Sequence, residues 1–294
     1  MTLNGSKSNF KISQLIFNRK TMHIYDTQSS RITLATIGSL NPLVAMTKAK
    51  KNNHADAFVP SDGISFETVG LDHSPEINLK DDPWPYHINQ YGYRGDDWDF
   101  KESPAVFGDS TVFGIGVQQP AAKILQEKYG DRVIPNLGIP SGSVVNIIKS
   151  FAAFAHLHPM SHAFITLPSL DRFYHTSQHE WGVNLGNLFP TYTNDHIDEK
   201  TKHYFFKLWL DGSHISYTLD YIDWAQQIAA SRNIKLFWTT WDSKQTAPLL
   251  QHAVGDKFFK YATINSDDSR DKAHPGISSH QKLADIYWNI IQQS

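Results

Sequence analysis

The chain contains no cysteine among its 294 residues. This absence excludes disulfide bonds, a thiol nucleophile and metal sites ligated by cysteine. It does not indicate a compartment, because oxidising and reducing environments both accommodate a cysteine-free chain. The chemistry therefore has to come from hydroxyl, imidazole, carboxylate and amide groups.

The chain also has little net charge and no long apolar run. Its formal net charge is -2, so no general attraction to nucleic acid or to anionic membranes is expected. The longest apolar stretch near the start, Ile32 to Met46, is broken by Gly38 and Pro42. It has the pattern of neither a signal peptide nor a membrane span, so a cytoplasmic location is the default expectation.

One short segment has the features of a nucleophile turn. The apolar run 104–107 is typical of a buried strand, and Gly108 follows it where a tight turn would precede a helix. The hydroxyl of Ser110 is then expected at the carboxyl end of a strand, where the ligand crevice of an open α/β sheet lies. A serine hydroxyl becomes a good nucleophile when a neutral imidazole accepts its proton and a carboxylate orients that imidazole.

A second segment, near the end of the chain, supplies a base and an acid. Asp271 and His274 are three residues apart in a predicted loop, and a Pro-Gly pair then breaks regular structure before the last predicted helix. Ser110, His274 and Asp271 are therefore the candidate nucleophile, base and orienting acid. Asp267 and Asp268 are alternatives to Asp271 if the loop folds differently. This mechanism implies no metal and no organic cofactor.

From residue 103 onward the pattern alternates between strands and helices. Strands are expected at 105–107, 133–136, 163–167, 234–239 and 261–264, and helices at 121–129, 143–156, 217–231 and 278–292. Such alternation implies a parallel sheet with helices on both faces, joined by right-handed crossovers. The predicted fold is an α/β three-layer α/β/α sandwich with a mostly parallel sheet and an N-terminal extension.

Taken together, these blocks resemble the SGNH hydrolases, also called GDSL-type esterases and lipases. Gly108-Asp109-Ser110 is similar to the first block of that family, and Asp271 with His274 is similar to the last. The segment 136–142 (Asn-Leu-Gly-Ile-Pro-Ser-Gly) is similar to the second block, and 89–95 to a segment that precedes the serine in many relatives. The resemblance covers roughly the last two thirds of the chain. It implies the same three-layer fold and a serine ester hydrolase.

The resemblance also implies an oxyanion hole, and here one block departs from the pattern. Where the family commonly has Gly-x-Asn-Asp, residues 168–171 read Pro-Ser-Leu-Asp, with Leu170 at the asparagine position. Leucine cannot donate a hydrogen bond, and loss of one such donor costs on the order of 3 kcal/mol in the transition state. The remaining candidate donors are the backbone amides of Ser110 and Gly142, or of Gly138 if the alignment shifts.

Two further patterns compete with this site. Asp211 and His214 repeat the Asp-x-x-His spacing, but no predicted strand leads into them, so His274 is preferred by its position. His175 and His179 would share one helical face and could bind a transition metal. A third ligand and the His-Glu-x-x-His pattern are missing there, so no metal site is predicted.

The segments outside the core suggest a domain division and a substrate. Residues 1–100 are expected to form an N-terminal extension and a sheet-covering segment, and the extension is a candidate for docking another protein. Residues 101–294 are expected to form the catalytic domain, with an insertion at about 172–214 that mixes aromatic and polar side chains. Aromatic platforms with polar edges favour an acylated sugar over a long acyl chain. The expected partner is a small-molecule or glycan ester.

The sequence thus predicts a serine esterase that removes a short O-acyl group, such as acetyl, from a carbohydrate through an acyl-enzyme. Leu170 and the N-terminal extension motivate a first alternative, a non-catalytic carbohydrate-binding or structural protein on the same fold. A second alternative is an O-acyltransferase, which would use the same three residues with an alcohol acceptor in place of water.

Overall fold

A computed structural model of the chain describes residues 59–61, 65–67, 89, 93–99, 101–130, 132–139, 142–174, 182–184, 199–260, 267–269 and 274–294. The strand expected at 261–264 and the candidate site residues Asp271, His175 and His179 lie outside these ranges, as do residues 1–58. In the described part of the chain, no helix combines the length and the apolar character needed to span a membrane.

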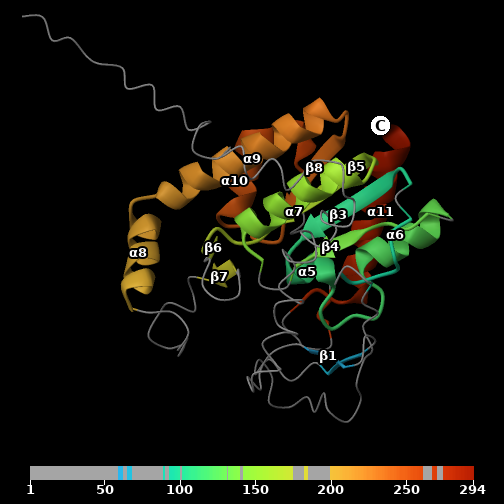
Figure 1. Cartoon of the computed structure of the whole chain (residues 1–294), viewed down its shortest axis with the longest axis horizontal. Coiled ribbons are helices and arrows are strands. Elements are labelled where there is room, and N and C mark those ends of the chain that lie inside the picture. The colour runs from blue at the N-terminus through green and yellow to red at the C-terminus, as the bar shows by residue number, and fades with distance from the viewer. Residues whose placement is uncertain are drawn as a thin grey trace, which may run out of the picture.

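The centre of the fold is a four-stranded sheet with the order β4-β3-β5-β8 (Figure 1). Its strands are β3 (Ser103–Gly108), β4 (Asn136–Gly138), β5 (Met160–Leu167) and β8 (Lys235–Thr240). Every neighbouring pair in this sheet is parallel. The chain goes from β3 to β4 on one side and then to β5 on the other side of β3. In open α/β sheets, ligands bind outside the carboxyl ends of the strands at such a reversal, so the carboxyl end of β3 is the expected place for a ligand site.

Helices pack on both faces of the sheet (Figure 1). They are α6 (Ala121–Tyr129), α7 (Val144–Leu157), α9 (Ser213–Ser231), α10 (Thr246–Val254) and α11 (Ile277–Gln293). α6 and α11 contact each other over one apolar core, and α7 and α9 contact each other over the other core. The three-layer α/β/α arrangement predicted from the sequence is therefore confirmed.

The two cores arise from the alternation of side chains along the central strands. Val106 and Phe164 belong to the core under α6 and α11, whereas Phe107 and Ile165 belong to the core under α7 and α9. Successive side chains of a strand point to opposite faces, so a strand covered on both faces has to be apolar throughout. This requirement explains why the run that leads into the nucleophile turn contains no charged residue.

Shorter elements surround this framework. They are β1 (Val59–Ser61), β2 (Ser65–Glu67), α5 (Ser110–Phe113), β6 (Arg172–Tyr174), β7 (Gly182–Asn184), α8 (Glu199–Leu210) and the 3-10 turn η3 (Gly255–Lys257). β1 pairs with β2 and β6 pairs with β7, each antiparallel. The insertion expected at 172–214 therefore contains β6, β7 and α8. α8 and α10 are additional to the four helices expected from the alternating pattern.

Two boundaries differ from the sequence prediction for reasons visible in the backbone. β4 begins at Asn136 and not at 133, although Pro135 O accepts a hydrogen bond from Val106 N at 3.0 Å. Proline has no backbone N–H to donate to β3, so regular pairing of β4 starts after Pro135. α7 begins one residue late because Ser143 is its cap, in a reciprocal capping box with Asn146.

Buried histidines make the folded state sensitive to acid. Burial lowers the pKa of His158 and His162 to about 4 and that of His280 to about 3. In an unfolded chain a histidine takes up a proton near pH 6.5. Between these values the unfolded state binds more protons than the folded state, so the free energy of unfolding decreases as the pH falls from about 6.5 to about 4.

We expect urea unfolding of the wild type to show this loss of stability between pH 7 and pH 4.5. His280→Gln should show a shallower dependence, because glutamine can accept the hydrogen bond that Ala121 N donates to His280 Nδ1 but has no proton to gain in this range. Equal slopes for the two proteins would show that His280 is not among the groups responsible.

Candidate active site

Ser110 is the first residue of α5, directly beyond the carboxyl end of β3. Asp109 caps this short helix, because its Oδ1 accepts a hydrogen bond from Thr111 N at 3.0 Å. A Cβ at Gly108 would lie 2.4 Å from Val112 Cγ2, so the strand can enter the helix this tightly only through a glycine. The local sequence therefore places the serine hydroxyl at the carboxyl edge of the sheet, where ligands bind in open α/β folds.

His274 meets this serine from the other end of the chain. Its Nε2 lies 2.9 Å from Ser110 Oγ, although the two residues are 164 positions apart. In the tautomer that leaves Nε2 unprotonated, the serine hydroxyl donates this hydrogen bond. That is the geometry in which an imidazole can take the proton of an attacking hydroxyl.

Backbone hydrogen bonds fix the loop that carries His274. Ser269 N donates to His274 O at 2.7 Å, and Gly276 N donates to Asp267 O at 2.8 Å. The segment 267–269 thus runs alongside 274–276 and positions the imidazole. Asp271 lies between these two described segments, and its contact with His274 stays a prediction.

Asp267, one of the alternative acids, is engaged elsewhere. Its carboxylate accepts hydrogen bonds from Ser278 N at 2.8 Å, from Ser279 N at 2.8 Å and from Ser279 Oγ at 2.7 Å. Burial alone would raise the pKa of Asp267, but these hydrogen bonds from Ser279 and Ser278 outweigh it and lower the pKa. Asp267 therefore caps the first turn of α11, and Asp271 and Asp268 remain the candidates for orienting His274.

The rival Asp-x-x-His pair organises the junction between α8 and α9. Oδ1 of Asp211 accepts a hydrogen bond from Ser213 N at 2.9 Å. The ring of His214 stacks on Trp209, with 4.4 Å between ring centroids, and its Nδ1 lies 3.3 Å from Leu208 O. The histidine that contacts Ser110 is His274.

The two glycine amides expected in the oxyanion hole are already hydrogen-bonded. Gly138 N donates to Asn136 Oδ1 at 3.0 Å, and Gly142 N donates to Ile139 O at 2.8 Å. Both amides are thus engaged within the chain, and their role as oxyanion donors stays a prediction. The amide of Ser110 donates to no acceptor in the described part of the chain and remains the candidate donor.

Gly138 has a packing role in place of the donor role. A Cβ at this position would lie 2.1 Å from Phe113 N, so the end of β4 contacts the backbone of α5 directly. Asn136 reinforces this contact, because its Nδ2 donates to Val112 O at 3.0 Å. Asn136 and Gly138, at the start and end of β4, thus hold α5 and the nucleophile turn in place.

Leu170 occupies an apolar environment. Its side chain is 5% exposed. It lines a cavity of about 620 Å³ whose walls are mostly apolar and also include His214, Gln245 and His252. Leu170 is thus a buried apolar residue, and its side chain provides no hydrogen-bond donor.

Arg94 is a structural residue that the sequence analysis missed. Its Nη1 donates to Phe113 O at 3.0 Å and Gly114 O at 2.5 Å, and its Nη2 donates to Val117 O at 2.6 Å and Gln118 O at 2.8 Å. A buried guanidinium thereby fixes the loop that follows α5. All four acceptors are backbone carbonyls, which every residue type has, so the sequence does not indicate these hydrogen bonds.

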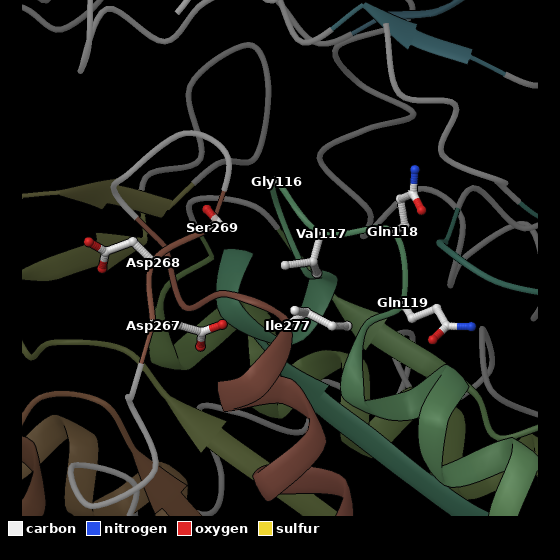
Figure 2. Close-up of a pocket in the computed structure, with 8 residues that line it drawn as sticks. All are labelled: Gly116, Val117, Gln118, Gln119, Asp267, Asp268, Ser269 and Ile277. Atoms are coloured by element: carbon white, nitrogen blue, oxygen red, sulfur yellow. The ribbon is translucent and has the colours of Figure 1, made fainter. Parts of the chain in front are cut away.

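A cavity of about 480 Å³ lies between this loop and the segment that pairs with His274 (Figure 2). It is lined by Gly116, Val117, Gln118, Gln119, Asp267, Asp268, Ser269 and Ile277. Figure 2 shows Val117 and Ile277 at its centre, with the two aspartates and the serine on one side and the two glutamines on the other. The described residues contain no group of three or more His, Asp or Glu side chains suited to a metal ion.

Comparison with known proteins finds distant likeness in fold. No protein-family model matches the chain, and no curated protein matches its sequence. Among solved structures, a carbohydrate acetylesterase family member from Sinorhizobium meliloti has 10% identity and a TM-score of 0.41, covering 66% of this chain and 98% of its own.

Two further solved structures have the same extent of overlap. A member of the lipolytic protein G-D-S-L family from Veillonella parvula has 13% identity and a TM-score of 0.39, covering 66% of this chain and 100% of its own. The psychrotrophic esterase EstA from Pseudoalteromonas sp. has 14% identity and a TM-score of 0.39, covering 66% of this chain and 98% of its own. At these values the function has to be inferred from the residues of this chain.

Gly138→Ala tests the support of the nucleophile turn by β4. The added methyl group should force α5 away from the sheet and destabilise the protein by about 1–3 kcal/mol, as overpacking of a dense interior does. The rate at which a phosphonate ester modifies Ser110 should fall with it. Gly130→Ala is the control, because nothing lies within 4 Å of a Cβ there and any cost comes from its φ of +103° alone. Equal loss of Ser110 reactivity in both variants would contradict the packing role.

Proposed function

We propose that this protein is a serine hydrolase of oxygen esters, with Ser110 as the nucleophile and His274 as the general base. The observation that carries the proposal is the 2.9 Å contact between Ser110 Oγ and His274 Nε2 at the carboxyl end of β3. A rigid parallel sheet supports the nucleophile, and a paired loop supports the base. Covalent catalysis by a hydroxyl needs a nucleophile and a base that are held in a fixed geometry.

The reaction would proceed by two displacements. Ser110 Oγ attacks the acyl carbon while its proton passes to His274 Nε2. The resulting tetrahedral intermediate collapses as the same proton is transferred to the leaving alcohol, and the acyl group stays on Ser110. A water molecule then gives a proton to Nε2 and attacks the acyl carbon, which releases the carboxylic acid and restores both side chains. Asp271 would orient His274 and stabilise its charged form.

The described donors provide modest stabilisation of the oxyanion. The amide of Ser110 is available, whereas the amides of Gly138 and Gly142 are hydrogen-bonded within the chain and the side chain of Leu170 has no donor. Removal of one donor from such a site slows a hydrolase by about 10²–10³-fold. We therefore expect slower turnover than a site with a complete set of donors would give.

The alcohol portion of the substrate is proposed to be a carbohydrate and the acyl portion to be short. The cavity in Figure 2 is adjacent to the paired loop of His274, and its volume falls within the range of about 300–1,000 Å³ that small-molecule sites occupy. Carboxylate, hydroxyl and carboxamide groups line it beside two apolar side chains. Such a lining suits a ring with many hydroxyl groups.

The test is hydrolysis of p-nitrophenyl acetate, butyrate and octanoate and of a fully acetylated sugar. We expect turnover that favours acetate in the wild type and in Ser231→Ala, which changes an exposed serine whose hydroxyl donates to Ile228 O of its own helix. Ser110→Ala and His274→Ala should lose at least about 10³-fold in kcat, because each removes a partner of the proton transfer.

Other outcomes select the alternatives. Sugar binding without hydrolysis, unchanged in Ser110→Ala, would favour a carbohydrate-binding protein. Acyl transfer to an added sugar at the expense of water would favour an O-acyltransferase. A preference for octanoate would point to the mostly apolar cavity beside Leu170 as the acyl site and would contradict the short-chain proposal.

A further inference from the structure

The residue directly before the nucleophile is a fully buried carboxylate. Asp109 is 0% exposed, and both of its carboxylate oxygens are used. Oδ1 accepts hydrogen bonds from the backbone amide and the hydroxyl of Thr111. Oδ2 accepts from Arg172 Nη1 at 2.8 Å and from Trp241 Nε1 at 3.1 Å. A buried charge with this many partners is an organising centre of its surroundings.

The partners of Asp109 come from separate parts of the sheet. Asp109 follows β3, Arg172 begins β6 shortly after the end of β5, and Trp241 directly follows β8. β3, β5 and β8 are consecutive in the sheet order. The guanidinium carbon of Arg172 also lies 5.5 Å from the centroid of the Trp241 ring. One carboxylate therefore ties together the carboxyl ends of three neighbouring strands.

Arg172 supplies the charge that this arrangement requires. Its side chain is 11% exposed, and no other ion pair with Asp109 occurs among the described residues. A carboxylate buried beside the nucleophile would repel the negative charge that develops on the substrate oxygen during attack. Compensation by a buried cation removes that repulsion. It also fixes the peptide group between Asp109 and Ser110, whose N–H is the candidate oxyanion donor.

We propose that Arg172 is a positioning residue for the nucleophile: acting through Asp109, it sets the orientation of Ser110 Oγ and N–H and neutralises the carboxylate behind them. This assignment rests on the proposed ester hydrolysis. Arg172 lies two residues after Leu170, which stands where the family commonly has asparagine. The same segment therefore lacks the amide side chain and supplies the guanidinium that pairs with Asp109.

The experiment compares kcat and KM for p-nitrophenyl acetate in the wild type and in Arg172→Met, Arg172→Lys, Asp109→Asn and the Asp109→Asn/Arg172→Met double variant. Arg132→Met is the matched control, since the Arg132 guanidinium is exposed and donates to the backbone oxygen of Glu102. Circular dichroism and thermal unfolding check that each protein is folded.

We expect Arg172→Met to lower kcat by about 100-fold with KM changed by less than about threefold, because the loss falls on the transition state. Arg172→Lys retains the charge and should stay within about tenfold of the wild type. The double variant removes both charges and should recover at least about tenfold in kcat relative to Arg172→Met. Arg132→Met should match the wild type. If Arg172→Met does not fold, the lysine and double variants still provide the comparison.

Three results would overturn the assignment. Arg172→Met could equal Arg132→Met in kcat, its loss could appear as a raised KM, or the double variant could be no faster than Arg172→Met. The last two would indicate direct contact between Arg172 and the substrate. Ser110→Ala is assayed alongside, so that a wild type without Ser110-dependent turnover overturns the proposed function itself, and the role of Arg172 with it.

Discussion

All four strands of the main sheet run in the same direction, and this constraint brings the chemistry of the chain to one edge. Parallel strands end together, so the segments after β3, β5 and β8 meet there. The segment after β3 carries Asp109 and Ser110, the segment after β5 carries Leu170 and Arg172, and Trp241 follows β8. The strand order reverses at β3, and such a reversal is where ligands bind in open α/β sheets.

The nucleophile turn is supported from several directions. The end of β4 contacts α5 at Gly138, which has no side chain. Arg94 donates to the carbonyl of the last residue of α5 and to three carbonyls of the loop that follows. Asp109 links the turn to Arg172 and Trp241. Rigid support of this kind matters because a displaced reactive group loses much of its rate advantage. The side chain of Leu170 donates no hydrogen bond, so the proposed mechanism depends more on the orientation of the Ser110 amide.

Much of the architecture could be predicted from the sequence, since it depends on local patterns. The apolar run before Gly108, the helical spacing of α6 and the Pro-Gly break before α11 all have direct structural counterparts. Ser110 and His274 were selected from the same patterns and lie in contact. The proposed acid, Asp271, lies outside the described residues and stays a prediction.

What the sequence could not predict depends on contacts between distant segments. The four hydrogen-bond acceptors of the Arg94 guanidinium are backbone carbonyls, which cannot be identified from residue types. The contacts among Asp109, Arg172 and Trp241 can be predicted only when the strand order is known, because the three residues follow different strands. The acceptors of the Gly138 and Gly142 amides, the Asn136 side chain and Ile139 O, also follow from the folded backbone and not from the residue types.

The most direct test of the central claim is covalent labelling with a fluorophosphonate, followed by mass spectrometry of proteolytic peptides. The account predicts one adduct per chain, located on Ser110, formed readily by the wild type and at least about 100-fold more slowly by His274→Ala. An adduct on another residue, or none on a protein shown to be folded, would contradict the assignment of Ser110 and His274 as nucleophile and base.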